Sequence, residues 1–175
     1  MPYLIMLFFL TMTNSLVLFD FSKTSELSDW TVVNDDVMGG QSHGLFYINT
    51  EGNGVFEGRV SLENNGGFSL VRYRMGSTDI QELQKVVIRL KGDGKRYQFR
   101  VKAKASDYFS YVGFFQTSGE WQLVEIPLAS LYPAFRGRRL SEPNFAGDSI
   151  EEIAILIGNE KNETFKLELD QITVQ

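Results

Sequence analysis

The segment of residues 34–42 has the sequence NDDVMGGQS and places two adjacent carboxylates, Asp35 and Asp36, shortly before a pair of glycines. A carboxylate in such a loop can bind a hard cation such as calcium together with backbone carbonyl oxygens. It can instead accept hydrogen bonds from the backbone of the turn that follows it. We favour this second, structural interpretation because the oxygen ligands lack a diagnostic calcium spacing. Asp35 or Asp36 remains the calcium candidate, and no other cofactor is predicted.

A second polar segment is ENNGG, residues 63–67, in which Asn64 and Asn65 precede Gly66 and Gly67. The two glycines indicate backbone angles that other residues rarely adopt. The two amides could bind sugar hydroxyls, or they could satisfy the backbone of a tight corner. We favour the corner and keep both asparagines as candidate ligand-binding residues.

A third segment, FRGRRL at residues 135–140, places Arg136, Arg138 and Arg139 within four residues. Guanidinium groups bind carboxylates or phosphates through paired hydrogen bonds. The three arginines could therefore pair with acidic residues of this chain, or bind an anion or an acidic partner. We favour internal pairing and name all three as candidate partner-binding residues.

Aromatic residues are concentrated between positions 108 and 121, where Tyr108, Tyr111 and Trp121 are candidates for a sugar-stacking platform. Most large aromatic side chains of a β-sandwich belong to its core. We therefore favour a core position and keep the platform as the alternative.

Catalytic motifs are scarce in this sequence. It has no cysteine and one histidine, His43, so thiol chemistry and a zinc site of several histidines are excluded within one chain. It contains no nucleophile elbow, phosphate-binding loop or zinc-protease motif. A glycosidase needs only two carboxylates, and the 22 acidic residues leave that possibility open. We predict that the chain is not an enzyme.

The composition indicates an ordinary globular domain. Of the 175 residues, 43% are hydrophobic and 22% are charged, which supports a folded core. The formal net charge of −5 lacks the basic excess of a nucleic-acid-binding protein, so we predict no nucleic-acid partner.

Alternating polar and apolar residues predict β-strands along most of the chain. In the segment of residues 97–105, Tyr97, Phe99 and Val101 would face the core and the residues between them would face outward. GDGK, residues 92–95, predicts a hairpin turn, and residues 129–148 predict a loop. Eight to ten such strands without a long helix predict an all-β fold, an antiparallel β-sandwich or jelly roll.

The first residues differ from the rest. Residues 3–12, YLIMLFFLTM, form an apolar run that is too short to span a bilayer but suits the core of a signal peptide. We predict that residues 1–15 are a signal peptide or an apolar N-terminal segment, and that residues 16–175 form one domain. An ordinary N-terminal strand is the alternative. This interpretation favours an exported or periplasmic location over a cytoplasmic one.

Several of these segments together resemble one family. WTVVNDDVMGGQSHG, GVFEGRVSLENNGGFSLVRYR, LKGDGKRYQFRVK and WQLVEIPLASLYPAFRGRRL occur in the order typical of the complex I intermediate-associated protein 30 (CIA30) domain, from about Phe19 to Val174. The signature positions, to which we assign a structural role, are Trp30, Asp35, Asp36, Met38, Gly39, Gly40, Ser42, Gly66, Gly67, Arg72 and Asp93.

The resemblance implies a galactose-binding-like jelly roll, similar to certain carbohydrate-binding modules, with no established catalytic residue. The mitochondrial member of the family is an assembly factor for respiratory complex I. This chain looks like a short bacterial relative, because it lacks an Arg- and Ser-rich transit peptide.

The functional prediction is therefore a non-catalytic, protein-binding domain related to assembly factors or chaperones. A carbohydrate-binding module of an exported protein is the alternative, and a glycosidase-like enzyme is a weaker one. The expected partner is a protein or a glycan, with no membrane-spanning segment after removal of the N-terminal residues.

Overall fold

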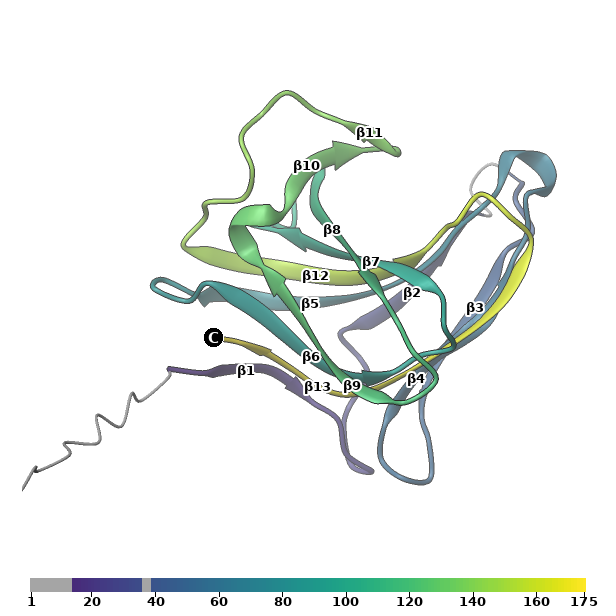
Figure 1. Ribbon diagram of the computed structural model, residues 1–175, viewed down its shortest axis with the longest axis horizontal. Coiled ribbons are helices and arrows are strands. Elements are labelled where there is room, and N and C mark those ends of the chain that lie inside the picture. The colour runs from purple at the N-terminus through teal and green to yellow at the C-terminus, as the bar shows by residue number, and fades with distance from the viewer. Residues whose placement is uncertain (1–13, 36–38) are drawn as a thin grey trace, which may run out of the picture.

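The computed structural model describes residues 14–35 and 39–175, which form two antiparallel β-sheets packed face to face (Figure 1). The predicted all-β sandwich is confirmed, with thirteen strands in the described residues instead of eight to ten. The six-stranded sheet contains, in order, β3 (His43–Ile48), β4 (Gly54–Val60), β13 (Glu163–Val174), β6 (Lys85–Lys91) and β9 (Trp121–Pro127), with β1 (Leu16–Asp20) also paired to β13.

The second sheet has seven strands and supplies the face on which the candidate site lies. Its order is β11 (Arg138–Arg139), β10 (Tyr132–Phe135), β8 (Ser110–Gln116), β7 (Arg96–Lys102), β12 (Ser149–Ile157), β5 (Ser69–Asp79) and β2 (Trp30–Asn34). Two short 3-10 helices, η2 (Glu63–Asn65) and η3 (Leu128–Ser130), complete the described elements.

The core lies between the sheets and follows the alternation of the strands. In β7, Tyr97, Phe99 and Val101 are fully buried, as predicted, and the residues between them face away from the core. In β12, Ile153, Ile155 and Ile157 point inward in the same way. The other side chains of these two strands therefore form the outer face of the seven-stranded sheet.

An aromatic cluster fills one end of the core. Trp30 of β2 stacks on Tyr73 of β5 with 4.9 Å between ring centroids, and Phe19 and Phe46 pack against Trp30 from the opposite sheet. Such pairs add stability beyond the burial of their apolar area. Trp30 thus belongs to the core.

Two local predictions were wrong. The GDGK segment is no hairpin, because β6 and β7 belong to different sheets and the turn carries the chain from one sheet to the other. The side chain of Asp93 holds this turn by accepting hydrogen bonds from the Tyr97 hydroxyl and the backbone N–H of Lys166. The expected loop of residues 129–148 contains a small hairpin, β10–β11.

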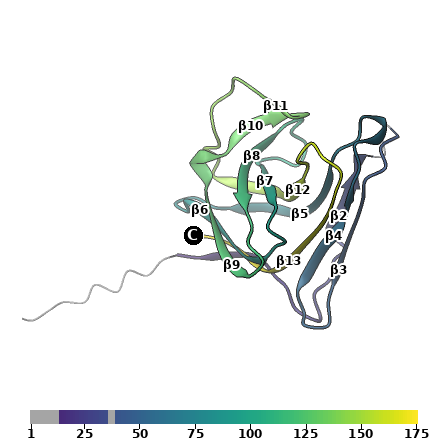
Figure 2. The ribbon, with the colours of Figure 1, turned by 45° about the vertical axis from the view of Figure 1, so that its right-hand side comes forward.

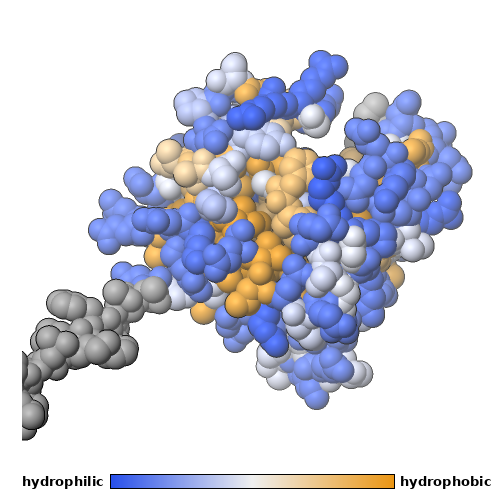
Figure 3. Space-filling view, viewed as in Figure 1, coloured by the Kyte–Doolittle hydropathy of each residue, from blue (hydrophilic) through white to orange (hydrophobic). Residues whose placement is uncertain are grey.

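Two structures stand on opposite sides of the outer face of the seven-stranded sheet. In Figures 1 and 2 the β10–β11 hairpin rises over one side, and the corner that contains η2 rises on the other. In Figure 3 they are separate hydrophilic lobes with a gap between them.

The predicted boundary between residues 15 and 16 stays a prediction, since residues 1–13 lie outside the described residues. Within the parts of the chain that the structure describes, no helix is long and apolar enough to cross a membrane.

Candidate binding groove

A groove of about 410 Å³ runs over the outer face of the seven-stranded sheet, between the β10–β11 hairpin and the loop that follows η2. Its floor comes from outward-facing residues of β5, β7 and β12, among them Arg72, Arg100 and Leu156. The alternation that buries Tyr97 and Phe99 thus turns their neighbours Gln98 and Arg100 into the groove.

The charges of the floor are unevenly paired. Glu152 of β12 is only 6% exposed, and its Oε2 accepts a hydrogen bond of 2.8 Å from Nε of Arg74. Arg100 donates from Nε and Nη2 to Oε1 of Gln98, a neutral acceptor. Burial lowers the pKa of Arg100, against an opposing effect of Tyr132. Lys102 donates to the backbone oxygen of Asp107 at 2.7 Å.

Aromatic side chains form one lip of the groove. Tyr108 is 62% exposed and lies edge to face with Phe135, with 5.4 Å between ring centroids, and with Phe109 at 5.2 Å. Of the three aromatic residues predicted as a platform, only Tyr108 lines this groove.

The other two platform candidates lie elsewhere. Tyr111 is half-buried between Phe109 and Phe145, with a centroid distance of 5.1 Å to Phe145. Trp121 begins β9 in the opposite sheet, where the guanidinium of Arg89 lies 4.9 Å from its ring centroid. The structure therefore does not bring the three together.

The three predicted arginines lie on the β10–β11 hairpin. Arg136 and Gly137 form its turn with φ of 49° and 76°, and both line the groove. Arg138 and Arg139 form β11, with the Arg139 guanidinium 4.7 Å from the ring centroid of Tyr132. Within the described residues none of the three arginines forms an ion pair, so the expected pairing with acidic residues of this chain is not seen there.

The two predicted asparagines form the corner at η2. Asn64 and Asn65 both have positive φ, of 55° and 59°, a conformation that asparagine tolerates better than most residues. The side-chain amide of Asn64 donates to the backbone oxygen of Gly39 at 2.8 Å. Neither asparagine lines the groove, and the Asn64 amide is used to join two loops.

Asp35 lies behind this corner and is surrounded by hydrogen-bond donors. Its Oδ1 accepts from the backbone N–H of Ser42 at 3.0 Å, and its Oδ2 accepts from the Ser42 hydroxyl and the backbone N–H of Gly67, each at 2.5 Å. Burial raises the pKa of Asp35, but these hydrogen bonds together outweigh burial and lower the pKa below its ordinary value. The ionised carboxylate of Asp35 therefore stabilises the folded loop through both of its oxygens.

Two glycines of the signature leave the space that the Asp35 side chain occupies. A Cβ at Gly40 would collide with Oδ1 of Asp35, and a Cβ at Gly66 would lie 2.5 Å from Oδ2. Gly39 has a φ of 83°, a conformation that favours glycine. Asp36 and Met38 lie outside the described residues. Within the described ranges, no group of three or more His, Cys, Asp or Glu side chains could hold a metal ion.

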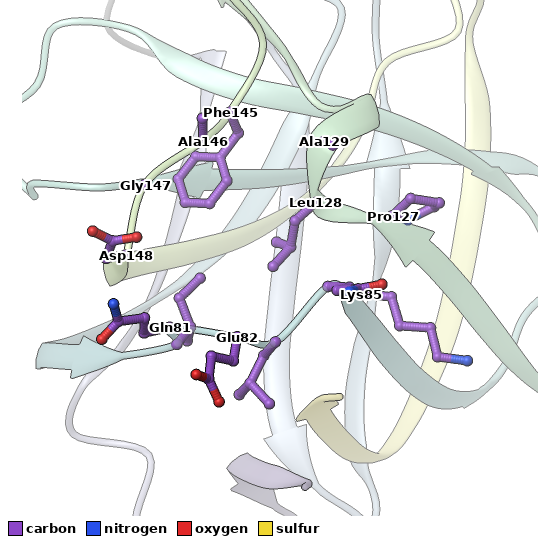
Figure 4. A pocket seen from close by; sticks show the side chains of 13 residues that line it. Gln81, Glu82, Lys85, Pro127, Leu128, Ala129, Phe145, Ala146, Gly147 and Asp148 are labelled. Carbon is purple, nitrogen blue, oxygen red and sulfur yellow. The ribbon is translucent and has the colours of Figure 1, made fainter. Parts of the chain in front are cut away.

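A second cavity of about 530 Å³ opens at an edge of the sandwich (Figure 4). Leu128 and Phe145 give it an apolar wall, and the exposed residues Glu82 and Asp148 belong to its rim.

The groove on the seven-stranded sheet contains one carboxylate, Glu152, so this groove lacks the pair that a glycosidase needs.

Sequence reasoning missed the groove floor. The alternation predicts only that Arg100 and Lys102 face outward from a strand, and the family resemblance places Arg72 in the structural signature. The available signal was the occurrence of basic residues at alternating positions of two strands, Arg72 and Arg74 in one and Arg100 and Lys102 in the other.

Comparison with known proteins identifies relatives of this chain. A family model described as Complex I intermediate-associated protein 30 (CIA30) matches residues 19–169. The mitochondrial complex I intermediate-associated protein 30 of Drosophila melanogaster is 24% identical over 144 residues, which cover 70% of this chain and 49% of the relative. The mouse (Mus musculus) protein of the same name is 23% identical over 187 residues, which cover 93% and 57%. The chain spans about half the length of these curated relatives.

The fold also resembles solved sugar-binding domains. The family 11 carbohydrate-binding module of Clostridium thermocellum, in complex with a β-1,3-1,4-mixed-linked tetrasaccharide, aligns with a TM-score of 0.64 and 16% identity. The alignment covers 91% of this chain and 94% of the module. At this identity the likeness establishes the fold alone.

Proposed function

The chain belongs to the CIA30 family, and from this premise we propose that it is a non-catalytic binding domain whose groove recognises a segment of another protein. The observation that carries the proposal is the groove on the seven-stranded sheet, which joins an exposed aromatic lip to a basic floor. Exposed aromatic and arginine side chains are the residue types that dominate protein–protein recognition. The names of the relatives extend the proposal to a role in assembling respiratory complex I.

A neutral glycan fits the groove less well. Four cationic side chains line it, Arg72, Arg100, Lys102 and Arg136, and a neutral ligand would remove water from them without supplying a countercharge. The Tyr108 and Phe135 rings meet at 74°, so they do not form a coplanar platform for a sugar ring. The likeness to the family 11 module keeps carbohydrate binding as the second candidate function.

Photo-crosslinking in cells that produce the protein tests the proposal. The photoreactive residue p-benzoylphenylalanine replaces Tyr108 at the groove lip or, as a matched control, Leu123 on the opposite sheet, which is 64% exposed against 62% for Tyr108. We expect a discrete crosslinked protein from Tyr108 and none from Leu123. A complex I subunit among the products would support the assembly role. Equal crosslinking from both positions, or none from Tyr108, would overturn the proposal.

The carbohydrate alternative has its own test, electrophoresis of the purified chain through gels that contain mixed-linked β-glucan. We expect no retardation relative to a gel without glucan. Retardation that Tyr108→Ala abolishes and Leu123→Ala preserves would replace the protein partner by a glycan.

A further inference from the structure

Two arginines that line the groove flank a small residue of the strand between them. Ala154 of β12 is paired in register with Arg72 of β5 on one side and with Arg100 of β7 on the other. Because neighbouring strands lie about 4.8 Å apart, the Cα atoms of the two arginines are separated by roughly 10 Å. Long side chains from both sides can therefore converge on a group that lies above the methyl group of Ala154.

Neither arginine has a countercharge. Nε of Arg72 is buried and has no hydrogen-bond partner among the described residues. Arg100 is bonded to the neutral Gln98, and within residues 14–35 and 39–175 neither Arg72, Arg100 nor Lys102 forms an ion pair. The one carboxylate of the groove, Glu152, is already bonded to Arg74.

This arrangement is costly unless a ligand completes it. Removing cations from water without a countercharge destabilises a protein, and a buried donor without a partner adds to that cost. The whole chain has a net charge of −5, yet the groove collects four cationic side chains and one anionic one. The positive charge is therefore local, and an incoming anion would supply the missing countercharge.

We infer that Arg72, Arg100 and Lys102 form an oxyanion-binding site, which holds a carboxylate or phosphate group of the protein segment that the groove recognises. The identity of the partner as a protein rests on the proposed function, and the presence of the anion site does not. A guanidinium binds such a group through two parallel N–H···O bonds, whereas a lysine contributes a single mobile charge. The two arginines orient the anion, and Lys102 adds attraction.

Arginine side-chain NMR on the purified chain tests the site directly. The Nε–H signals of Arg72 and Arg100 are assigned from their loss in Arg72→Lys and Arg100→Lys. The probes are inorganic phosphate, a capped glutamate peptide, the matching glutamine peptide and glucuronate. We expect saturable shifts of both signals with phosphate or the glutamate peptide and none with the glutamine peptide. Arg89, which lies in the other sheet and pairs with Asp170, serves as the internal reference.

Variants give the matched control. Arg72→Gln should weaken binding of the tighter probe at least tenfold. Lys23→Gln removes the same charge from an exposed position outside the groove and should change binding less than twofold. An equal loss in both variants would reduce the site to general electrostatic attraction and overturn the inference. The saturable shifts themselves are measured on the unaltered chain, so that part of the test does not depend on how Arg72→Gln or Lys23→Gln folds.

The outcomes separate this inference from the proposed function. Shifts of Arg72 and Arg100 no larger than those of Arg89 with every oxyanion would overturn the site, while crosslinking at Tyr108 would still support a protein partner. Saturation by glucuronate alone would keep the anion site and overturn the protein partner. If both phosphate and the glutamate peptide saturate the site, the tighter of the two identifies the group that the partner presents.

Discussion

The loop around Asp35 and the groove floor around Arg72 both withdraw charged groups from water, but they treat them in opposite ways. The Asp35 carboxylate accepts from two backbone N–H groups and one hydroxyl within 3.0 Å, and from a third N–H, of Phe68, at 3.3 Å. The buried Nε of Arg72 has no partner in the described residues. A satisfied buried charge serves the fold, whereas an unsatisfied one lowers stability.

The sharpest test of this contrast is Asp35→Asn. The amide keeps the shape of the carboxylate but turns an NH₂ group toward backbone donors, and charged hydrogen bonds are lost. We expect the free energy of unfolding to fall by about 2–4 kcal/mol in urea denaturation. Asp148→Asn is the control, because that side chain is exposed and should change stability by less than about 0.5 kcal/mol. Similar values for the two variants would contradict the structural role of Asp35.

The same carboxylate predicts a pH dependence. The folded pKa of Asp35 is lowered from its ordinary value of 3.8, so the unfolded chain binds this proton more readily. Its contribution to stability is complete above the ordinary pKa and is lost as pH falls through the lowered one. Urea denaturation at a series of pH values should therefore show a smaller loss of stability below about pH 4 in Asp35→Asn than in the unaltered chain. Parallel curves would show that Asp35 does not supply this dependence.

A smaller effect is expected from Gly40→Ala. Its Cβ would collide with Oδ1 of Asp35 and push the carboxylate away from the N–H of Ser42. We expect a loss of about 1–3 kcal/mol in the free energy of unfolding. Gly119→Ala is the matched control, since a Cβ there meets nothing within 4 Å and the φ of Gly119 is not positive. Equal free energies of unfolding for the two variants would show that the Asp35 carboxylate is held less tightly than the structure indicates.

The smallest effect on stability is expected from Arg72→Met. The change keeps an unbranched side chain and removes a buried donor that has no partner, so the free energy of unfolding should stay within about 1 kcal/mol or rise. Binding of the anionic probe should be lost in the same protein. A destabilisation as large as that of Asp35→Asn would make Arg72 a structural residue and remove the contrast between the two regions.

The sequence predicted the sandwich because its strands have one buried face and one exposed face. The alternation of Tyr97, Phe99 and Val101 survives in β7 because each of them is buried in the core. The GDGK turn misled the prediction because Asp-Gly signals a tight reversal without indicating whether the next strand stays in the same sheet. The small β10–β11 hairpin was missed because four-residue and two-residue strands are too short to show a period.

The site was less predictable than the fold. Tyr108 and Arg136, which were candidates because of their residue type, line the groove. Tyr111 instead packs against Phe145, and Trp121 lies in the opposite sheet. Arg72 and Arg100 lie on either side of Ala154 only because β12 inserts between β5 and β7, strands that are neither consecutive nor directly paired. No pattern within one segment of sequence contains that information.

The order of the strands has a consequence for synthesis on the ribosome. Among the strands of the described residues, β12 and β13 come after all the others, and each lies inside its sheet, with β12 between β7 and β5 and β13 between β4 and β6. Until residues 149–174 have left the exit tunnel, β4, β5, β6 and β7 lack the partners that these two strands provide. Neither sheet can therefore close during translation of the earlier residues. The nascent chain carries open strand edges until β12 and β13 emerge. During that interval, a chaperone that covers such edges would protect it from aggregation.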